Sequence, residues 1–357
     1  MSSLTLKRKT FSIEELKNTS VDEGQTEFEK STIKFCKAWL SEQQEFKIQT
    51  SGSTGAPKEI IITRSSMEAS ARMTIHALQL NAGDTPLVCL DTKYIAGQMM
   101  LVRCLVLGMN IIAVEPSANP FESIDQPIDF IALVPYQLEN ILDQSPEKLD
   151  KVRCAIIGGA AISNELKEKI KKIKCAMYAT YGMTETISHI ALQKLNGPDA
   201  QEYFEALENV HLRLDNRECL CIKADHLGEE IITNDLVTLM SDQKFKWLGR
   251  IDNVINSGGI KIIPEKVETV LEKIFDSHQI KNRFFIAGLP DEKLGQRVVM
   301  VLEGDPLDQT QLDKLISKAS THLTKYELPK EFKFVKKFVE TATGKINRYS
   351  SSANVST

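Results

Sequence analysis

The sequence lacks several features that would direct it to particular classes of protein. It contains no apolar run approaching the roughly 20 residues that cross a bilayer. The stretch from Met1 to Lys9 carries no apolar core of the kind found in signal peptides. The formal net charge is only −4 over 357 residues, so no excess of positive charge points to nucleic acid or lipid as a partner. We expect neither a membrane span nor a nucleic-acid partner.

Metal-type cysteine pairs and internal repeats are also missing. The seven cysteines are an odd number, and none shows the Cys-x-x-Cys spacing typical of zinc sites. Cys219 and Cys221 alternate with apolar neighbours, as inward-facing residues of one strand do. Buried, reduced thiols in a cytoplasmic protein explain this usage most simply.

What is present is an ordinary globular composition, with 42% hydrophobic and 26% charged residues, in a chain long enough for two domains. Up to about residue 23 no strong period appears. From there, apolar runs of strand length alternate with helical patterns. The expected helices cover residues 28–40, 65–80, 95–107, 135–142 and 164–173, and the expected strands 46–48, 59–63, 87–90, 111–114, 130–134, 154–157 and 175–179. This alternation predicts an α/β fold with a largely parallel sheet covered on both faces.

The pattern changes after Asn209. Short strands separated by turns predict an antiparallel, barrel-like subdomain, beginning with a hairpin around residues 215–217. Beyond Asp252 a smaller α+β unit is expected, with helices over 264–275 and 309–323 and strands near 284–286, 298–302 and 332–335. The residues after Arg348 are rich in Ser, Asn and Thr, and we expect them to be frayed.

One polar stretch organises the rest of the chain. Residues 49–58 read Gln-Thr-Ser-Gly-Ser-Thr-Gly-Ala-Pro-Lys and lead directly into the apolar segment 59–63. Glycines allow close backbone approach, hydroxyls donate hydrogen bonds and Lys58 adds a charge, a combination that suits a polyphosphate. The spacing is not that of a Walker A loop. The alternative is a flexible Gly/Ser linker, which has no need of a Pro-Lys pair tied to a strand.

Three more stretches follow in order: Tyr-Gly-Met-Thr-Glu-Thr at 181–186, Leu-Gly-Arg-Ile-Asp at 248–252, and Thr-Gly-Lys-Ile-Asn-Arg at 343–348. With the glycine-rich loop, this chain resembles the adenylate-forming superfamily of acyl-CoA synthetases, peptide-synthetase adenylation domains and luciferases. The resemblance implies a large ATP- and acid-binding domain over residues 1–250. It also implies a small mobile lid domain over 253–357, with the hinge at Asp252.

The resemblance implies that this chain joins a carboxylic acid to ATP, releases pyrophosphate, and passes the acyl group to the thiol of CoA. The β- and γ-phosphates would be held by the loop residues Thr50, Ser51, Gly52, Ser53, Thr54, Gly55 and Lys58. Tyr181 would line the adenine, Thr184 would contact the α-phosphate and Glu185 would hold Mg²⁺, for which one carboxylate plus phosphate oxygens is a normal ligand set. The alternative for Glu185 is an acid in the first turn of a helix.

By the same resemblance, Asp235 in Thr-Asn-Asp would bind the ribose hydroxyls, together with Arg250; here Asn234 replaces the usual glycine. Arg250 and Asp252 could instead form a surface ion pair. Lys345 matches the lysine that catalyses adenylate formation, against the alternative of an exposed tail lysine.

The stretch Ser257, Gly258 and Gly259 would approach CoA, although such glycines also serve ordinary turns. One departure concerns the His-x-x-Gly stretch that lines the acyl pocket in many relatives, because Tyr94 stands where the histidine is expected. None of the six histidines looks like a metal ligand or the partner of a nucleophile.

Within the superfamily, this compact chain, with Gly158 and Gly159 and a basic residue at Arg103, resembles the o-succinylbenzoate–CoA ligases of menaquinone synthesis. That acid has two carboxylates, so the one that is not activated needs a partner, and Arg103 lies in an apolar helix. A structural Arg–acid pair is the alternative. Two other functions stay open: transfer of the acyl group to a carrier-protein thiol or an amine, and nucleotide sensing without turnover. The oligomeric state is not predicted.

Overall fold

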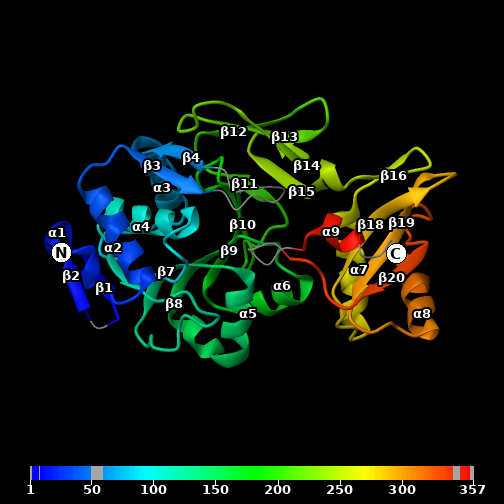
Figure 1. Cartoon of the computed structure of the whole chain (residues 1–357), viewed down its shortest axis with the longest axis horizontal. Helices are drawn as coiled ribbons and strands as arrows, with labels where there is room; N and C mark the ends of the chain where they lie inside the picture. The colour runs from blue at the N-terminus through cyan, green and yellow to red at the C-terminus, as the bar shows by residue number, and fades with distance from the viewer. Residues whose placement is uncertain (1, 8, 50–58, 341–345, 354–357) are drawn as a thin grey trace.

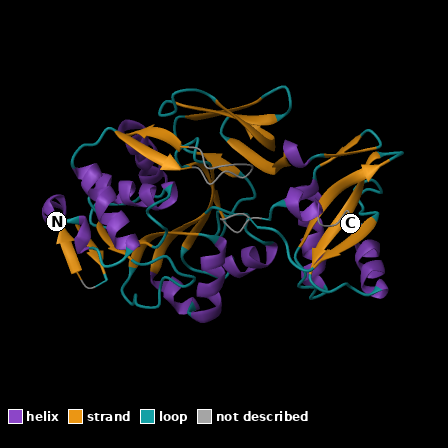
Figure 2. Ribbon diagram, in the orientation of Figure 1, coloured by secondary structure: helices purple, strands orange, loops and turns teal. Residues whose placement is uncertain are grey.

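The computed structural model describes residues 2–7, 9–49, 59–340 and 346–353 (Figures 1 and 2). Its helices are α1 (Ile13–Asn18), α2 (Glu27–Leu40), α3 (Arg64–Ala77), α4 (Ile95–Leu107), α5 (Pro135–Gln144), α6 (Asn164–Ile170), α7 (Pro264–Ser277), α8 (Gln309–Ala319) and α9 (Arg348–Ala353). Three short 3₁₀ segments are η1 (Val21–Glu23), η2 (Pro146–Lys151) and η3 (Ile251–Asn253).

The strands fall into three sheets. The largest sheet contains β1 (Ser3–Leu6), β2 (Lys9–Ser12), β5 (Pro86–Val88), β6 (Asn110–Ala113), β7 (Ile128–Leu133), β8 (Val152–Ile157), β9 (Ala176–Gly182), β10 (His189–Lys194), β11 (Phe204–Ala206), β12 (Val210–Leu214), β13 (Cys219–Ala224), β14 (Ile231–Ser241) and β15 (Lys244–Arg250). A hairpin joins β3 (Glu45–Gln49) and β4 (Glu59–Thr63). The last sheet contains β16 (Ile255–Ser257), β17 (Ile260–Ile262), β18 (Phe284–Asp291), β19 (Gly295–Glu303) and β20 (Glu331–Val335).

The predicted α/β fold is confirmed. Strands β9, β8, β7, β5, β6 and β1 pair in parallel, in that order. Alternate residues of each strand enter opposite cores: Cys154 and Ile156 of β8 pack on the side of α2, α3 and α4, whereas Ala155 and Ile157 pack on the side of α5 and α6. Because both faces are covered, these strands read as continuous apolar runs in the sequence.

The predicted antiparallel strands also form, but they extend the same sheet. Strand β10 pairs antiparallel with β9, and the order continues through β11, β15, β14, β13 and β12 (Figure 1). The end of β9 therefore lies within one continuous sheet, between its parallel and antiparallel parts. The strands that carry Asp235 and Arg250, β14 and β15, belong to the same sheet and are separated from β9 by β10 and β11.

The five-stranded sheet has its own two cores. Val298, Met300 and Leu302 of β19 pack with α7 and α8, while Val299 and Val301 pack against Phe338 on the opposite face. In Figure 1 this sheet lies at the end of the long axis opposite β1 and β2. The expected α+β composition of the chain beyond Asp252 is thus confirmed.

Two local predictions were wrong or incomplete. The segment after Arg348 is not frayed at its start, because Arg348–Ala353 forms α9 and Ser351 is buried. Before residue 23, where no period was evident, β1 pairs in parallel with β6 and is covered by β2. Among the described residues, no helix combines the length and apolar character that crossing a bilayer requires.

Candidate active site

A tight turn joins β9 to β10 and carries Thr184 and Glu185. Gly182 has to be glycine here, because a Cβ atom would lie 2.4 Å from the Cα atom of His189. The turn is closed by Thr186, whose hydroxyl accepts from the backbone N–H of Met183 at 2.9 Å. Glu185 is exposed and outside any helix, so it is not the first-turn helix acid considered as an alternative.

Tyr181, at the end of β9, contacts the expected ribose residue. Its hydroxyl donates to Oδ2 of Asp235 at 2.6 Å, and Nε1 of Trp247 donates to Oδ1 of the same carboxylate at 3.2 Å. Burial, and then the charge of Asp235, raises the pKa of Tyr181, so the phenol remains a donor. Asp235 is directly opposite Arg250 in the β14–β15 pairing, so both side chains leave the same face.

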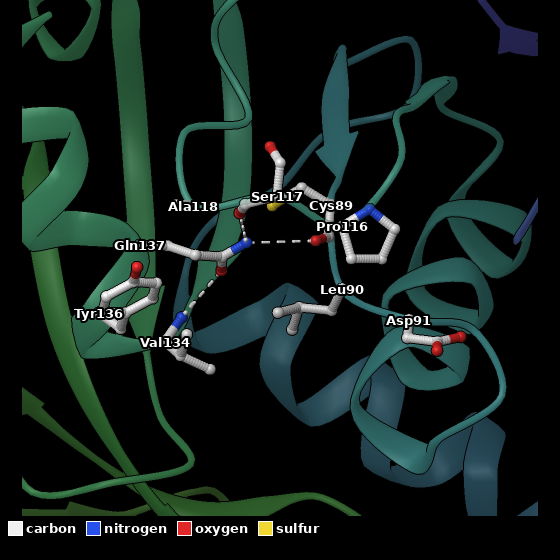
Figure 3. A pocket seen from close by; sticks show the side chains of 9 residues that line it. All are labelled: Cys89, Leu90, Asp91, Pro116, Ser117, Ala118, Val134, Tyr136 and Gln137. Atoms are coloured by element: carbon white, nitrogen blue, oxygen red, sulfur yellow. Dashed lines mark hydrogen bonds between the residues drawn. The ribbon is translucent and has the colours of Figure 1, made fainter. Parts of the chain in front are cut away.

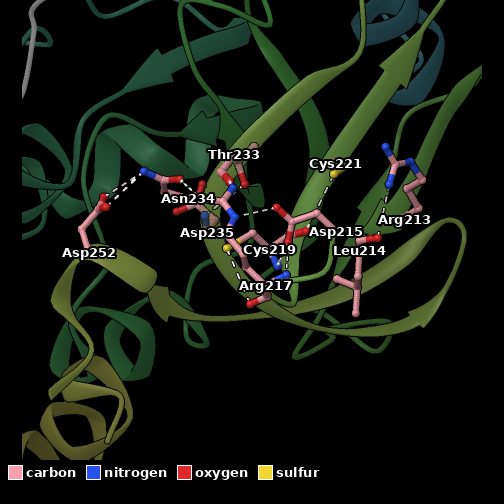
Figure 4. Close-up of polar contacts among 10 residues, drawn as sticks. All are labelled: Arg213, Leu214, Asp215, Arg217, Cys219, Cys221, Thr233, Asn234, Asp235 and Asp252. Atoms are coloured by element: carbon pink, nitrogen blue, oxygen red, sulfur yellow. Dashed lines mark hydrogen bonds and ion pairs between the residues drawn. The ribbon is translucent and has the colours of Figure 1, made fainter. Parts of the chain in front are cut away.

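Arg250 and Asp252 form the ion pair considered in the sequence, with Nη2 and Oδ2 2.6 Å apart. Asn234 donates to both carboxylate oxygens of Asp252, at 3.1 and 3.3 Å (Figure 4). Arg217 in turn donates to the Oδ1 atom of Asn234 at 3.1 Å. A network of polar side chains therefore links β14 to η3, the segment that leads to the second sheet.

A pocket of about 380 Å³ opens where β5, β6 and β7 end (Figure 3). Gln137 ties these strand ends together, because its Nε2 donates to the carbonyl oxygens of Cys89 and Ser117 and its Oε1 accepts from the N–H of Val134. In doubly wound sheets, ligands bind at carboxyl ends of strands such as these. Gly159 adjoins the pocket, since a Cβ atom there would lie 3.4 Å from a methyl group of Val134.

The expected acyl-pocket residues Tyr94 and Gly158 stand at the ends of two elements, α4 and β8. Tyr94 precedes α4 and is 55% exposed. Gly158 follows β8, and a Cβ atom at this position would be 2.3 Å from the hydroxyl oxygen of Thr180. A side chain at this position would therefore displace the Thr180 hydroxyl, so packing favours glycine here.

Arg103 is buried in α4 with 2% of its surface exposed. Its Nη2 donates to the hydroxyl of Ser188 at 2.6 Å, whereas its Nε has no hydrogen-bond partner among the residues that the structure describes. Within the described part of the chain, no carboxylate forms an ion pair with it, so the structural Arg–acid pair is not found there. Burial lowers the pKa of Arg103 to about 10, which leaves the guanidinium charged at neutral pH.

Gly258 and Gly259 form the two-residue loop of the β16–β17 hairpin, with φ angles of 60° and 83°. Both lie in the left-handed region, which explains the two glycines as a turn requirement. Both are exposed, and Ser257 is buried beside Gly295.

Two groups of expected site residues lie outside the described residues. They are the loop residues Thr50, Ser51, Gly52, Ser53, Thr54, Gly55 and Lys58, and the lysine Lys345. Within the described ranges, no cluster of three or more His, Cys, Asp or Glu could hold a metal ion alone. An exposed Glu185 in a turn nevertheless fits a magnesium ion whose other ligands are phosphate oxygens.

The arrangement of the nucleotide motifs agrees with a comparison of sequences. The sequence pattern of AMP-binding enzymes matches residues 8–237. The chain belongs to the AMP-binding enzyme family. A solved family structure of similar length, the acyl-CoA synthetase (AMP-forming)/AMP-acid ligase II-like protein from Dyadobacter fermentans, is 38% identical. The match covers 97% of this chain and 99% of that one, with a TM-score of 0.65.

Curated relatives are longer. The 2-succinylbenzoate–CoA ligase of Salmonella typhimurium is 26% identical over 292 residues, covering 78% of this chain and 62% of the relative. The chain thus spans about three fifths of that protein. The o-succinylbenzoate CoA synthetase from Bacillus subtilis, solved with ATP and magnesium, is 22% identical with a TM-score of 0.73, covering 86% and 69% of the two chains. At this low identity, the similarity shows that the two chains share a fold.

Sequence reasoning missed several side chains that the fold brings to the site. Trp247 sits in a strand pattern and gave no signal of its own. Ser188 and His189 follow the Tyr181 stretch closely, and this proximity was the available signal. The sequence gives no sign that His189 differs from the other histidines, yet this residue is buried and lies close enough to Arg103 to feel its charge.

Proposed function

We propose that this chain is an ATP-dependent carboxylic acid–CoA ligase. It would form an acyl-adenylate with release of pyrophosphate and then transfer the acyl group to the thiol of CoA, releasing AMP. The observation that carries the proposal is the convergence of Tyr181, Asp235 and Arg250 from three strands. This matches an adenosine site in which an aromatic ring lines the base and the carboxylate takes the ribose hydroxyls.

The phosphates would extend from this site toward Thr184, at the turn after β9. We assign Glu185 to a magnesium ion, which when bound would neutralise charge on the phosphate oxygens. The loop residues 50–58 would surround the β- and γ-phosphates, and Lys345 would stabilise charge on the α-phosphate as the carboxylate attacks. A relative solved with ATP and magnesium supports these cofactors.

We further propose that residues 1–250 and 253–357 are separate domains that move about Asp252. The two sheets have separate cores, and η3 connects them. The turn at Ser257, Gly258 and Gly259 is exposed and would allow CoA to approach its backbone. We place the enzyme in the cytoplasm, because all seven cysteines are buried and free.

For the acid, we propose o-succinylbenzoate, a precursor in menaquinone synthesis. Arg103 is a buried cation whose Nε has no partner within the described ranges, and an unpaired buried charge is costly. A second carboxylate on the substrate would satisfy it through a charge-assisted contact. Tyr94, Gly158 and Gly159 would line the rest of the acid site. The activity in the names of the curated relatives points to the same acid.

Pyrophosphate exchange against a panel of aryl and alkyl acids tests the reaction and the acid together. We expect o-succinylbenzoate to support exchange and CoA to accept the acyl group. Exchange without CoA acylation would indicate a carrier-protein thiol or an amine as acceptor. Absence of exchange with every acid would reject the ligase and favour a nucleotide sensor.

Arg103→Ala tests the acid site directly. We expect capture of the dicarboxylate to weaken by about 2–4 kcal/mol, because the second carboxylate would be left without its cation. The Michaelis constant for ATP should not change. Arg72→Ala, which removes an exposed arginine from the neighbouring helix α3, is the matched control. An unchanged Michaelis constant for the acid in folded Arg103→Ala would remove Arg103 from the site.

A further inference from the structure

We propose that Thr74, His189 and Ser188 form a hydrogen-bond relay that positions Arg103 for the second carboxylate of the acid substrate. The inference rests on the proposed function and extends it to three residues outside the family motifs discussed above. Thr74 belongs to α3 and Arg103 to α4, His189 is the first residue of β10, and Ser188 immediately precedes it. The relay therefore connects three elements of the large sheet and its helical cover.

The contacts form a continuous chain of polar atoms in the core. Arg103 Nη2 is 2.6 Å from Ser188 Oγ, and Ser188 Oγ is 3.5 Å from His189 Nδ1, the longest link. His189 Nε2 is 3.0 Å from Thr74 Oγ1. Thr74 is fully buried and His189 is 7% exposed, so water cannot readily replace these partners.

The direction of each hydrogen bond in the relay follows from the groups at its two ends. Thr74 Oγ1 donates its hydrogen to the carbonyl oxygen of Ser70 at 3.3 Å, because a carbonyl can only accept. His189 must then donate from Nε2 to Thr74, which leaves Nδ1 as an acceptor for the Ser188 hydroxyl. With its hydrogen directed to His189, Ser188 presents a lone pair to the Arg103 guanidinium.

A neutral imidazole is essential to this arrangement. Burial first, and then the positive charge of Arg103, lowers the pKa of His189 well below its usual value. A neutral ring can accept from Ser188, whereas an imidazolium would donate from both nitrogens and repel the guanidinium. The relay thus holds Nη2 of Arg103 through Ser188, while Nε of Arg103 has no hydrogen-bond partner among the described residues.

Orientation matters because a guanidinium recognises a carboxylate through a fixed fork of N–H groups. A side chain held in the binding orientation loses less conformational entropy when the acid arrives. Ser188 and His189 also follow directly from the turn that carries Thr184 and Glu185. One short segment therefore carries Ser188, which contacts Arg103, and the residues Thr184 and Glu185 proposed for the phosphates and magnesium.

Thr74→Val tests the relay, because it removes the hydroxyl while keeping the shape of the side chain. In pyrophosphate exchange we expect the Michaelis constant for o-succinylbenzoate to rise about tenfold, the scale of one buried hydrogen bond. The constants for ATP and for 4-oxo-4-phenylbutanoate, the same acid without its ring carboxylate, should stay as in wild type. Thr74→Ser should restore the o-succinylbenzoate value.

Thr19→Val is the matched control. Thr19 is also buried, and its hydroxyl likewise donates to the carbonyl oxygen four residues earlier, but it belongs to the end of α1. Two substitutions at His189 test its contact with Ser188 and its contact with Thr74 separately. His189→Asn can keep an acceptor toward Ser188, whereas His189→Gln can keep a donor toward Thr74, so we expect Asn to preserve acid binding better.

The outcomes distinguish the inference from the function it extends. The wild-type enzyme could prefer o-succinylbenzoate to its monocarboxylate analogue while Thr74→Val shows the same preference. That result would overturn the relay and leave the proposed function standing. Wild-type enzyme that shows no such preference overturns the acid assignment and the relay together. An equal loss for both acids in Thr74→Val would indicate a general packing role and would also reject the relay.

Discussion

At the residue scale, the proposed nucleotide site would depend on how Asp235 is held. Its two carboxylate oxygens accept hydrogen bonds from Tyr181 and Trp247, and its backbone N–H donates to the hydroxyl of Thr233 at 3.0 Å. With 7% of its surface exposed, the carboxylate has little freedom to rotate. The ribose hydroxyls would therefore meet acceptors that are already in position.

Trp247→Phe should raise the Michaelis constant for ATP about fivefold, because it removes one hydrogen bond that orients Asp235. The constant for the acid should not change. Initial-rate kinetics with each substrate varied in turn measure both values.

The other tryptophan supplies the control for this substitution. Trp39 packs in α2, with the Arg64 guanidinium 4.1 Å from its ring. Trp39→Phe should leave ATP binding unchanged. Equal effects of the two substitutions on ATP would show that Trp247 acts through stability alone.

Residues could be predicted from the sequence where a motif fixes both type and spacing. Tyr181, Asp235 and Arg250 are predicted in this way, and the structure brings them together. Thr74 and His189 could not be found, because their contact spans 115 positions and neither belongs to a motif. Buried polar pairs of this kind become visible only when the packing of helices on strands is known.

At the element scale, Arg348 fastens α9 to α7. Its guanidinium lies 2.6 and 2.7 Å from the two carboxylate oxygens of Glu268, and it stacks over Phe285 at 5.7 Å. The side chains are 28% and 12% exposed, so the pair is shielded from water. Arg348 is the last residue of the Thr-Gly-Lys-Ile-Asn-Arg stretch, so this contact fixes the position of that last residue.

Arg348→Ala should therefore lower the free energy of unfolding by about 2 kcal/mol, less than the full cost of stranding a buried charge because the site is partly open. Denaturant unfolding followed by fluorescence and circular dichroism measures the change. Arg283→Ala is the control, because Arg283 also contacts two carboxylates and an aromatic ring but is 45% exposed. A loss in Arg348→Ala no larger than in the control would contradict the anchoring role.

Helix α7 also carries a carboxylate with unusual titration. Burial, and then the charge of Glu268, raises the pKa of Glu272 to about 7. Because the pKa of Glu272 is higher in the folded state, its protonated form contributes to the free energy of unfolding at low pH. This contribution is lost as the pH rises from the ordinary glutamate pKa of 4.5 toward 7. Asn164 of α6 donates to Glu272 at 3.1 Å, so the effect bears on the α6–α7 contact.

Glu272→Gln cannot ionise and should escape this loss. We expect it to match wild type near pH 4.5 and to be more stable by about 1–3 kcal/mol at pH 8. Unfolding measured at both pH values tests the sign. A variant less stable than wild type at pH 8 would show that the ionised carboxylate stabilises the contact.

Elements with strong local signals were predicted closely. Helix α4 has the predicted bounds, Ile95–Leu107, because apolar residues fill it and Gly108 ends it with a left-handed φ of 75°. Strands β1 and β2 are four residues long, and β1 pairs with β6 about 100 positions away. Such short strands are stabilised by their distant partner, so their own sequence carries little signal.

At the scale of the whole molecule, the largest sheet joins parallel and antiparallel parts that the sequence suggested as separate units. Composition and periodicity distinguished the two parts correctly, since buried parallel strands and half-exposed antiparallel strands have different patterns. Their union depends on the pairing of β9 with β10, across a turn that only Gly182 can accommodate. Pattern alone does not encode which strand edges meet.

The proposed domain movement predicts a separation of half-reactions. Lys345→Ala should abolish adenylate formation, because the charge that stabilises the attack on the α-phosphate is lost. Thioester formation from a supplied acyl-adenylate should stay largely intact, since a different face of the small domain would serve that step.

Single-turnover assays of each half-reaction, with circular dichroism to confirm folding, measure the effect. Equal loss of both steps in a folded variant would argue against movement between two arrangements.

Because all seven cysteines are buried, the proposed domain movement can be tested with fluorescent labels. Each thiol is buried and its pKa is raised, chiefly by burial, so little reactive thiolate forms at neutral pH. A cysteine introduced at an exposed position such as Lys314 and another at Glu147 should react with maleimide dyes long before the native ones. Fluorescence energy transfer between two such dyes could then follow the small sheet relative to the large one during turnover, in a protein that keeps every native thiol.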